Sequence, residues 1–368
     1  MKPVKIGIVG VGAISGIYLE NITKTFREIE VAGVCDLIRE RAERAAENFQ
    51  IAKIYEDMYE LFADPEVDIV LNLTRPYEHY GVTMAALRAG KHVYSEKPLA
   101  ASLKEGKEIM ALAKEKNRMV GGAPDTFLGA GIQTCRKLIE DGYIGDPIGA
   151  AGFMICHGHE SWHPDPEFYY KYGGGPMFDM GPYYLTAMVN LVGCVRTVSA
   201  MTRASFPRRT ITSNAHFGEI IDVDVPTYIA GTMQFENGAI GTLFTTFDVH
   251  YSGQARLEIY GSAGTLFVPD PNGFGGPVQL LRPEDGGIRE IPLVFGYSQN
   301  CRALGLADMA KALQTGRRFR ANSDQTYHVL EIMEGFLRSG EEKKPVEILS
   351  RFEKTPLMPH SIIPGILD

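Results

Sequence analysis

The stretch "VKIGIVGVGAIS", residues 4–15, decides the fold of the first third of the chain. Its first six residues are mostly apolar and β-branched, which is typical of a buried parallel strand. The G-x-G-x-x-S pattern at its end is a variant of the dinucleotide-binding fingerprint, in which a helix begins after the turn and points N–H groups at a pyrophosphate. A plain glycine-rich turn is the alternative. The residues expected to hold the cofactor here are Gly10, Gly12, Ala13, Ile14 and Ser15.

A second expected strand, at residues 31–36, ends in an acidic residue. Asp36 follows Gly12 by 24 positions. A carboxylate there can accept hydrogen bonds from both hydroxyls of the adenosine ribose and would repel a 2′-phosphate, which favours NAD over NADP. Arg39 and Arg41 weaken this preference, because an arginine can pair with that phosphate. A helix cap is the alternative role for Asp36.

Expected helices and apolar strands go on alternating after this unit. The segments with a helical pattern are residues 42–49 and 79–90, and those with a strand pattern are residues 67–73 and 91–98. Such alternation predicts an α/β domain with a doubly wound parallel sheet, a Rossmann domain, which we place at residues 1–125. Ligands bind such sheets at the carboxyl ends of the strands, where this chain carries Thr74, Glu96 and Lys97.

Two further stretches carry a resemblance to a known family. "AGKHVYSEKPLA" spans residues 89–100, and "GGGPMFDMGPYY" spans residues 173–184. Together with the opening G-x-G and the segment from Thr74 to His79, they resemble the glucose–fructose oxidoreductase/inositol dehydrogenase/MocA (Gfo/Idh/MocA) family of sugar and cyclitol dehydrogenases. The resemblance implies an NAD-binding Rossmann domain followed by an α+β domain, here residues 126–368. A large, mostly antiparallel sheet in that domain would serve substrate binding and oligomerisation.

The pattern of the second domain fits this implication independently. Its strand-like stretches are residues 148–156, 227–235, 238–249 and 255–268. The tripeptide Glu236–Gly238, "ENG", supplies a hairpin turn between two of them. Helical patterns return only late in the chain, at residues 302–315 and 325–339.

Lys97 is the central site residue that the resemblance implies, since it would hydrogen-bond the reacting hydroxyl and help to move its proton. A partly desolvated lysine beside a cationic nicotinamide should have a lowered pKa, which suits proton exchange near neutral pH. Glu96 would orient this lysine or line the cofactor site. By the same resemblance Thr74 and His79 belong near the nicotinamide, and a place in the first turn of its helix is the alternative for His79.

Asp179 and Tyr183 belong to the second motif. Their i, i+4 spacing would place both on one face of a helix that begins after "GGGPMF". In most of the family the motif reads Asp-x-Gly-x-His, with the histidine as general base, so tyrosine at this position puts that base in doubt. A buried tyrosine beside Lys97 could relay a proton if its phenol pKa were lowered. The alternatives are that Tyr183 packs against the cofactor and that His163 supplies the base.

The string "HESWH", residues 159–163, has the letters of the zinc-peptidase motif H-E-x-x-H. That motif needs a helix, whereas Pro164 and Pro166 follow at once and push the preceding residue out of the α region. Aromatic faces with nearby polar groups suit a sugar ring. We therefore expect a substrate loop and no metal site, with interdomain packing as the alternative. The residues expected to bind substrate from this loop are His159, Glu160, Trp162 and His163.

The composition argues against other classes of protein. A net charge of -8 and a pI near 5.7 do not suit a nucleic-acid-binding surface. No stretch approaches the ~20 apolar residues that span a bilayer. The five cysteines are widely spaced and form no C-x-x-C, so neither a disulfide framework nor a cysteine zinc site is expected, and a reducing cytoplasm fits best.

The sequence thus predicts a cytoplasmic, homo-oligomeric oxidoreductase that uses NAD rather than NADP. Its substrate would be a small sugar, glycoside or cyclitol, oxidised by hydride transfer from a secondary hydroxyl. Oxidation at C3 of a glucoside is the specific hypothesis. A nucleotide-bound sensor or structural relative that has lost catalysis is the alternative, because the family histidine is missing at residue 183.

Overall fold

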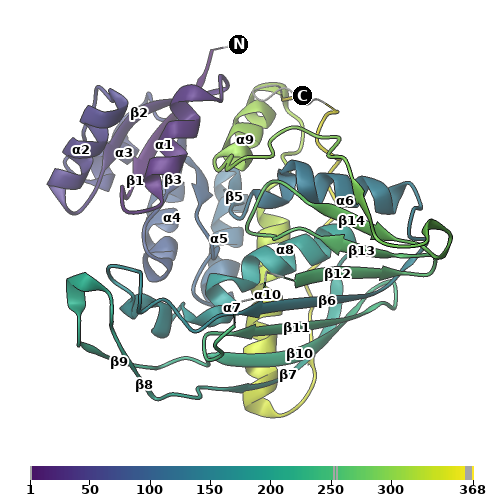
Figure 1. Ribbon diagram of the computed structural model, residues 1–368. Helices are drawn as coiled ribbons and strands as arrows, with labels where there is room; N and C mark the ends of the chain where they lie inside the picture. The colour runs from purple at the N-terminus through teal and green to yellow at the C-terminus, as the bar shows by residue number, and fades with distance from the viewer. Residues whose placement is uncertain (1, 252, 254–255, 361–366) are drawn as a thin grey trace.

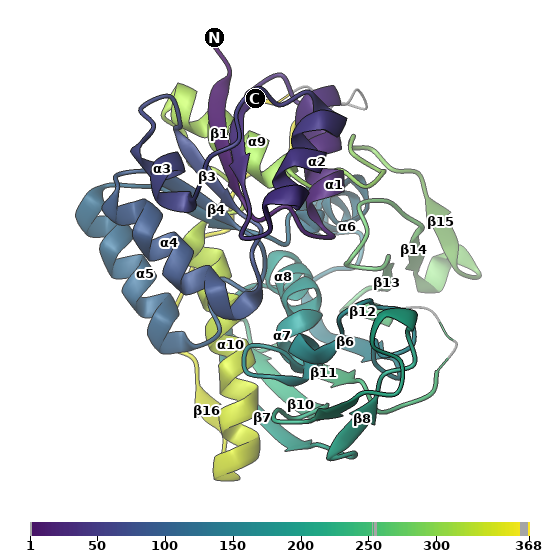
Figure 2. The same ribbon diagram turned by 90° about the vertical axis from the view of Figure 1, so that its left-hand side faces the viewer.

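The structure is a computed structural model that describes residues 2–251, 253, 256–360 and 367–368. These residues form a five-stranded sheet, a nine-stranded sheet and a two-stranded ribbon (Figure 1). The two large sheets belong to successive parts of the chain, and helices lie between them (Figure 2). Within these ranges no helix is both long enough and apolar enough to cross a membrane.

The five-stranded sheet is parallel throughout, with strand order β2-β1-β3-β4-β5. Its strands are β1 (Val4–Val9), β2 (Ile29–Cys35), β3 (Ile69–Asn72), β4 (His92–Ser95) and β5 (Val120–Gly122). All four residues of β3 are buried, as a central parallel strand requires. β2 pairs with one edge of β1, and the chain then crosses to the opposite edge of β1, where β3 pairs. This reversal creates the crevice in which doubly wound folds bind ligands, and it confirms the predicted Rossmann topology.

The helices that connect these strands follow the sequence pattern closely. They are α1 (Ser15–Lys24), α2 (Arg39–Phe49), α3 (Met58–Ala63), α4 (His79–Arg88) and α5 (Leu103–Lys116). Side-chain caps begin two of them: Asp57 accepts N–H groups at the start of α3, and Ser102 accepts one at the start of α5. α3 and α5 are additions to the elements that the sequence predicted.

The nine-stranded sheet has the order β15-β14-β13-β12-β6-β11-β10-β7-β16. Its strands are β6 (Pro147–Ile155), β7 (Val195–Arg203), β10 (Tyr228–Phe235), β11 (Ile240–Thr246), β12 (Arg256–Gly261), β13 (Thr265–Val268), β14 (Val278–Leu281), β15 (Arg289–Ile291) and β16 (Val346–Glu347). Only β6 and β11 pair in parallel, so the predicted mostly antiparallel sheet is confirmed. The expected hairpin at Glu236–Gly238 joins β10 to β11, and Gly238 has a positive φ of 89° there.

Helices cover one face of the nine-stranded sheet. The helices of this half are α6 (Ala130–Glu140), α7 (Gly175–Asp179), α8 (Gly181–Leu191), α9 (Leu304–Thr315) and α10 (Ser323–Glu342). Every residue of α8 is buried, and α10 packs along β7. Met201 on β7 and Ile240 on β11 point to the other face and are exposed.

The last helices also reach back to the first sheet. Gly121 of β5 forms a bridge with Asn322, and the Gly122 N–H donates to the Ala321 carbonyl at 3.1 Å. Nearby, the buried Asp125 carboxylate accepts the Gly305 N–H at 3.0 Å. The edge of the Rossmann sheet is therefore completed by residues close to the end of the chain.

A two-stranded ribbon projects from the second domain, at the lower left of Figure 1. It consists of β8 (Arg208–Thr210) and β9 (Ile220–Asp222), which pair in antiparallel register. The sequence analysis did not predict these strands. Short 3-10 turns complete the structure at Pro76–Glu78, Thr126–Leu128, Glu167–Tyr170, Asn214–His216 and Pro283–Asp285.

Candidate active site

The glycine-rich turn lies between β1 and α1 and has the shape that a dinucleotide needs. Gly10 has a φ of +90°, and a Cβ there would lie 3.0 Å from the Leu73 carbonyl group, so a larger residue would be strained and crowded. A Cβ on Gly12 would meet no atom within 4 Å, because this glycine faces open space. The Ser15 hydroxyl donates to the Gly12 carbonyl at 2.8 Å and fixes the turn. These residues fit a pyrophosphate at the start of α1.

Asp36 follows β2 and lies beside this turn. Its carboxylate accepts the Val11 N–H at 2.7 Å and the Ile38 N–H at 2.8 Å. It does not cap α2, which begins at Arg39 without a side-chain cap. A carboxylate has about four lone-pair positions, so two remain for ribose hydroxyls. Arg39, which the sequence analysis considered as a partner for a 2′-phosphate, forms ion pairs with Glu43 and Glu56.

His79 joins the two turns that follow β3 and β4. Its side chain is only 1% exposed, with Nδ1 at 2.7 Å from the Pro98 carbonyl oxygen and Nε2 at 3.0 Å from the Thr74 carbonyl oxygen. Burial lowers the pKa of His79. His79 is the first residue of α4, but its ring reaches across the crevice floor and ties Thr74 to the turn that carries Lys97.

Glu96 is buried beneath that turn. Its carboxylate accepts the Tyr18 hydroxyl at 2.7 Å and the backbone N–H of Lys97 at 2.9 Å. Burial and the adjacent Glu96 raise the pKa of Tyr18 well above its ordinary value, so the phenol stays a hydrogen-bond donor. Glu96 thus orients Lys97 through its backbone rather than through its ammonium group.

Lys97, Asp179 and His159 form a chain of polar contacts between the two domains. The Lys97 Nζ donates to Asp179 Oδ1 at 2.7 Å and to the Asp179 carbonyl oxygen at 2.9 Å. The other carboxylate oxygen, Oδ2, lies 3.2 Å from His159 Nε2. Asp179 therefore holds a cation on one side and an imidazole on the other.

The pKa of Lys97 is opposite in direction to the expectation. Burial is the largest single influence and would lower this pKa, but Asp179, with smaller contributions from Tyr183 and Glu96, raises it overall. Burial alone would raise the pKa of Asp179, but Lys97 and His159 hold it below its ordinary range. The expected lowering of the Lys97 pKa is wrong for this geometry, because a buried carboxylate stabilises the ammonium form.

Asp179 and Tyr183 lie on two short helices rather than one, so the prediction of a single helix is wrong. α7 ends at Asp179, and α8 begins at Gly181 with Pro182 in its first turn. Proline has no N–H to continue a preceding helix and disfavours the α conformation before it. Both side chains still meet Lys97, whose Nζ lies 5.4 Å from the centre of the Tyr183 ring.

Tyr183 is buried, and its neighbours shift the pKa of its phenol in opposite directions. Burial raises the pKa of Tyr183, whereas Lys97 and Arg302 act to lower it, and the net direction is upward. The lowered phenol pKa that a proton relay would need is therefore absent in this geometry. The sequence analysis missed Arg302, which it placed only as the first residue of a predicted helix, because no spacing rule links it to Tyr183, 119 positions earlier.

The 159–163 string is a loop, as its prolines predicted. It makes a single turn closed by the His163 N–H on the His159 carbonyl at 3.0 Å, and this turn does not continue into an α-helix. His163 Nδ1 accepts the Asp165 N–H at 3.0 Å, and burial lowers the pKa of this imidazole. Across the described ranges no three His, Cys, Asp or Glu side chains gather as metal ligands would.

The side chains of this loop separate into two groups. His159 faces Asp179 and belongs to an aromatic cluster in which its ring centre lies 4.1 Å from that of Tyr169 and 5.2 Å from that of Trp162. Trp162 is 62% exposed. Glu160, in contrast, is buried against Arg209, with 3.1 Å between Oε1 and Nη1. The structure therefore brings His159, but not the Glu160 carboxylate, to the lysine.

An ion pair holds the far end of the loop against the Rossmann domain. Arg75, in the turn after β3, pairs with Asp165, and its guanidinium lies over the Phe168 ring. The loop is thus fixed between the crevice and the second sheet.

The predicted residues that meet around Lys97 are Glu96, Asp179 and Tyr183, with His159 joined through Asp179, and His79 ties the Lys97 turn to Thr74.

Comparison with known proteins identifies both halves of the chain. Residues 4–122 match the family model described as "Oxidoreductase family, NAD-binding Rossmann fold", and residues 132–267 match the model described as "GFO/IDH/MocA C-terminal domain". The two matches follow each other along the chain and together cover most of it.

Curated relatives and solved structures agree with this. The inositol 2-dehydrogenase/D-chiro-inositol 3-dehydrogenase of Lactiplantibacillus plantarum is 36% identical over 39% of this chain and 42% of that protein. The myo-inositol 2-dehydrogenase of Thermotoga maritima is 24% identical over 72% of this chain and 75% of the relative.

Among solved structures, levoglucosan dehydrogenase in its apo form covers 95% of this chain and all of its own, with a TM-score of 0.82 and 21% identity. An NAD-binding oxidoreductase from Klebsiella pneumoniae gives a TM-score of 0.81 at the same coverage and identity. At such identities these two likenesses show the fold alone. With both family models matched in order, the chain belongs to the Gfo/Idh/MocA family of oxidoreductases and has that family's NAD-binding Rossmann fold.

Proposed function

We propose that this protein is an NAD-dependent dehydrogenase that oxidises a secondary hydroxyl of a sugar, glycoside or cyclitol. The observation that carries the proposal is the Lys97 ammonium, held by Asp179 at the carboxyl ends of the Rossmann strands. A nicotinamide bound in this crevice would supply the hydride acceptor. Lys97 hydrogen-bonds the reacting oxygen and stabilises its developing negative charge. Asp179 holds the lysine and can accept a neighbouring hydroxyl.

The proton of the reacting hydroxyl needs an acceptor, and two residues are candidates. The lowered pKa of His163 keeps its imidazole neutral near pH 7, and its Nδ1 would take the proton after releasing the Asp165 N–H that it accepts. The raised pKa of Tyr183 keeps its phenol protonated, which suits a hydrogen-bond donor better than a base. We therefore assign the base role to His163 and a positioning role to Tyr183.

Replacing these two residues one at a time separates the roles. We expect His163→Ala to lower kcat by about 10²-fold, because a general base contributes at least that much. Tyr183→Phe keeps the ring and removes only a hydroxyl, so we expect a loss of about tenfold or less. The measurement is kcat from NADH formation at 340 nm between pH 6 and 10. A larger loss in Tyr183→Phe than in His163→Ala would reverse the assignment.

The substrate class follows from the relatives and from the loop. The two curated relatives described above are inositol dehydrogenases, and levoglucosan dehydrogenase shares the fold. The aromatic cluster of His159, Trp162 and Tyr169 offers ring faces for the C–H side of a pyranose. Oxidation at C3 of a glucoside is our specific proposal. A panel of methyl glucosides, 3-deoxyglucose, myo-inositol and levoglucosan, with NADH formation as readout, tests it. Turnover of 3-deoxyglucose would contradict C3 oxidation, and no turnover of any glucoside or cyclitol would contradict the class.

Asp36 is expected to make the enzyme prefer NAD to NADP. Its carboxylate stands beside the turn that would hold the pyrophosphate, where a 2′-phosphate would meet a negative charge. We expect Asp36→Ser to raise the ratio of kcat/KM for NADP to that for NAD by at least tenfold. Asp57→Ser, which changes an acidic cap of α3 instead, is the control. An unchanged ratio in Asp36→Ser would show that another residue sets the preference.

A second candidate function is a nucleotide-bound sensor without catalysis, favoured by the tyrosine at residue 183. Saturable NADH binding, seen as enhanced cofactor fluorescence, together with no turnover of the sugar panel would support it. The intact contact between Lys97 and Asp179 supports the dehydrogenase.

We further propose a cytoplasmic homo-oligomer with a Rossmann domain at residues 1–125 and a substrate domain at residues 126–368. The five cysteines are all unpaired, which suits a reducing compartment. The exposed Met201 and Ile240 on the outer face of the nine-stranded sheet support assembly through that face. Light scattering of the wild type and of Met201→Glu would test this assembly.

A further inference from the structure

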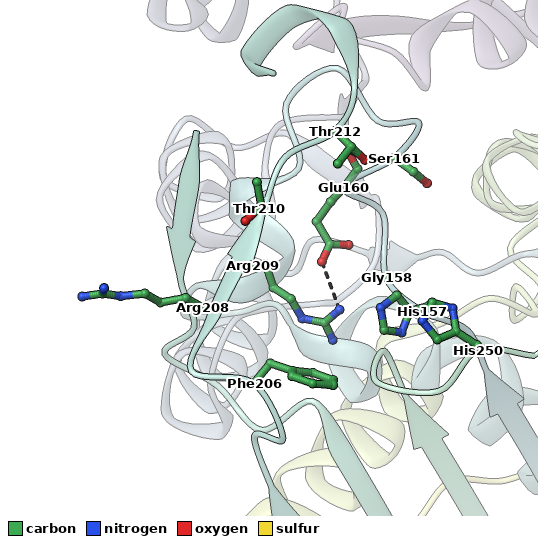
Figure 3. A pocket seen from close by; sticks show the side chains of 10 residues that line it. All are labelled: His157, Gly158, Glu160, Ser161, Phe206, Arg208, Arg209, Thr210, Thr212 and His250. Atoms are coloured by element: carbon green, nitrogen blue, oxygen red, sulfur yellow. Dashed lines mark hydrogen bonds and ion pairs between the residues drawn. The ribbon is translucent and has the colours of Figure 1, made fainter. Parts of the chain in front are cut away.

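A cavity lies on the side of the 157–161 loop that faces away from Asp179 and Lys97. Its volume is about 530 Å³, and its walls come from that loop, from β8 with the residues before and after it, and from His250 (Figure 3). His159 turns toward Asp179, whereas its two neighbours, Gly158 and Glu160, line this cavity. The cavity is therefore separate from the Lys97 site but shares one loop with it.

Arg209 is the main charged group of its wall. This side chain is only 6% exposed and forms ion pairs with Glu160 at 3.1 Å and with Asp248 at 2.5 Å. Its Nε is buried and has no hydrogen-bond partner among the described residues, and the same holds for His157 Nδ1. Buried polar atoms without a partner cost free energy, and a polar ligand in the cavity would offset that cost.

The charges around the cavity favour a neutral ligand. Arg209 faces two carboxylates, Glu160 and Asp248, while Arg208 points out of the cavity in Figure 3 and pairs with Asp222 at 3.0 Å. Each of the two lining arginines is thus already paired with a carboxylate, so the wall offers no unpaired positive charge. Burial lowers the pKa of His157, so this imidazole adds no charge near pH 7. An anionic ligand would therefore find no free cation to pair with.

The remaining groups suit the two sides of a sugar ring. The Phe206 ring and the imidazoles of His157 and His250, stacked with 3.5 Å between ring centres, offer apolar faces. Thr210 and Thr212 add hydroxyl groups at the rim. The volume lies within the range of small-molecule pockets and is ample for one pyranose ring.

We propose that this cavity is a second binding site for a neutral sugar ring, built on the reverse side of the catalytic loop. The proposal rests on the proposed function for the class of its ligand. The Glu160–Arg209 ion pair joins the site to the loop segment that places His159 beside Asp179. A sugar bound here would therefore contact the same loop that holds His159 in the Lys97 site.

Trp162 is the only tryptophan of the chain and adjoins Ser161, which lines the cavity, so its fluorescence reports binding at this loop. The titration uses D-glucose, with D-glucose 6-phosphate as the anionic comparison, in the full-length protein without added cofactor. Thr212→Phe fills the cavity, Phe206→Ala removes its apolar face, and Lys97→Ala changes the opposite side of the loop. Ile220→Phe places the same bulk on β9 at an exposed position that is not part of the cavity wall.

We expect a saturable glucose transition that Thr212→Phe and Phe206→Ala each weaken at least tenfold. Ile220→Phe and Lys97→Ala should leave it within about twofold of the wild type. The proposal is overturned if no transition occurs, if it persists in both cavity variants while Lys97→Ala removes it, or if glucose 6-phosphate binds tenfold more tightly than glucose. Because fluorescence needs no turnover, failure of the dehydrogenase proposal would be seen separately, as absent NADH formation.

A neutral sugar ring could be free or could be the second ring of a disaccharide substrate. In the second case, Thr212→Phe should lower kcat/KM for cellobiose at least tenfold and leave that for methyl glucoside within about twofold. In the first case, both kcat/KM values stay unchanged and only the fluorescence transition moves. Either result supports a neutral-sugar site and identifies its ligand.

Discussion

Lys97→Ala should lower kcat by about 10³-fold and leave NADH binding within about threefold of the wild type. The ammonium group is the donor that faces the crevice, and it is held within 2.7 Å of Asp179. Removing it deprives the reacting oxygen of its stabilising charge but leaves the glycine-rich turn intact. Single-turnover NADH formation and NADH fluorescence titration measure the two quantities. Retention of a tenth or more of the wild-type kcat would contradict this role for Lys97.

Truncating Lys97 also leaves the buried Asp179 without its cation, so loss of activity could come from misfolding. The double variant Lys97→Met/Asp179→Asn removes both charges together and avoids an unpaired buried carboxylate. We expect it to bind NADH and to be as inactive as Lys97→Ala.

Asp179→Asn gives a pH signature of the same contact. Without the carboxylate, the main influence that opposes burial is lost, so the pKa of Lys97 falls. Since the reaction needs the ammonium form, the alkaline fall of kcat should move to lower pH. A fall at the wild-type pH would mean that another group titrates there.

Arg209→Ala should destabilise the protein by about 3–5 kcal/mol, because it leaves Glu160 and Asp248 buried without their shared cation. The Arg209, Glu160 and Asp248 side chains are all nearly inaccessible to solvent. Arg209 also donates to the Phe247 carbonyl oxygen at 2.6 Å, so the change removes a backbone contact as well. Urea unfolding followed by Trp162 fluorescence measures the loss.

The neighbouring residue provides a matched control. Arg208 pairs with Asp222 at 3.0 Å, but both side chains are largely exposed. Arg208→Ala should therefore cost less than about 1 kcal/mol. Equal effects of the two alanine variants would show that the buried network does not stabilise the loop.

The sequence predicted the Rossmann half well because local patterns determine it. Alternating apolar strands and helices fix a parallel sheet, and the G-x-G turn locates its ligand-binding end. In the second domain, the paired strand patterns and the "ENG" turn indicated the β10–β11 hairpin. These signals act over a few residues, so they can be seen without knowing the tertiary structure.

Most of the wrong predictions about the site depend on contacts between residues that are far apart in the sequence. One of them overlooked a local signal. The partner of Glu160 is Arg209, 49 positions later, and no spacing rule connects them. The rise in the Lys97 pKa depends on Asp179, 82 positions away. The break between α7 and α8, however, could have been predicted from Gly181-Pro182, since a Gly-Pro pair commonly interrupts a helix.

The contact between β5 and the segment around Asn322 has a consequence for synthesis on the ribosome. The edge of the Rossmann sheet emerges early, but Ala321 and Asn322, which complete it, follow roughly two hundred residues later, about 10 to 40 seconds at ordinary elongation rates. During that interval the β5 edge is open to pairing with other nascent chains. We therefore expect this edge to be exposed to aggregation during synthesis until the segment around Asn322 has left the exit tunnel.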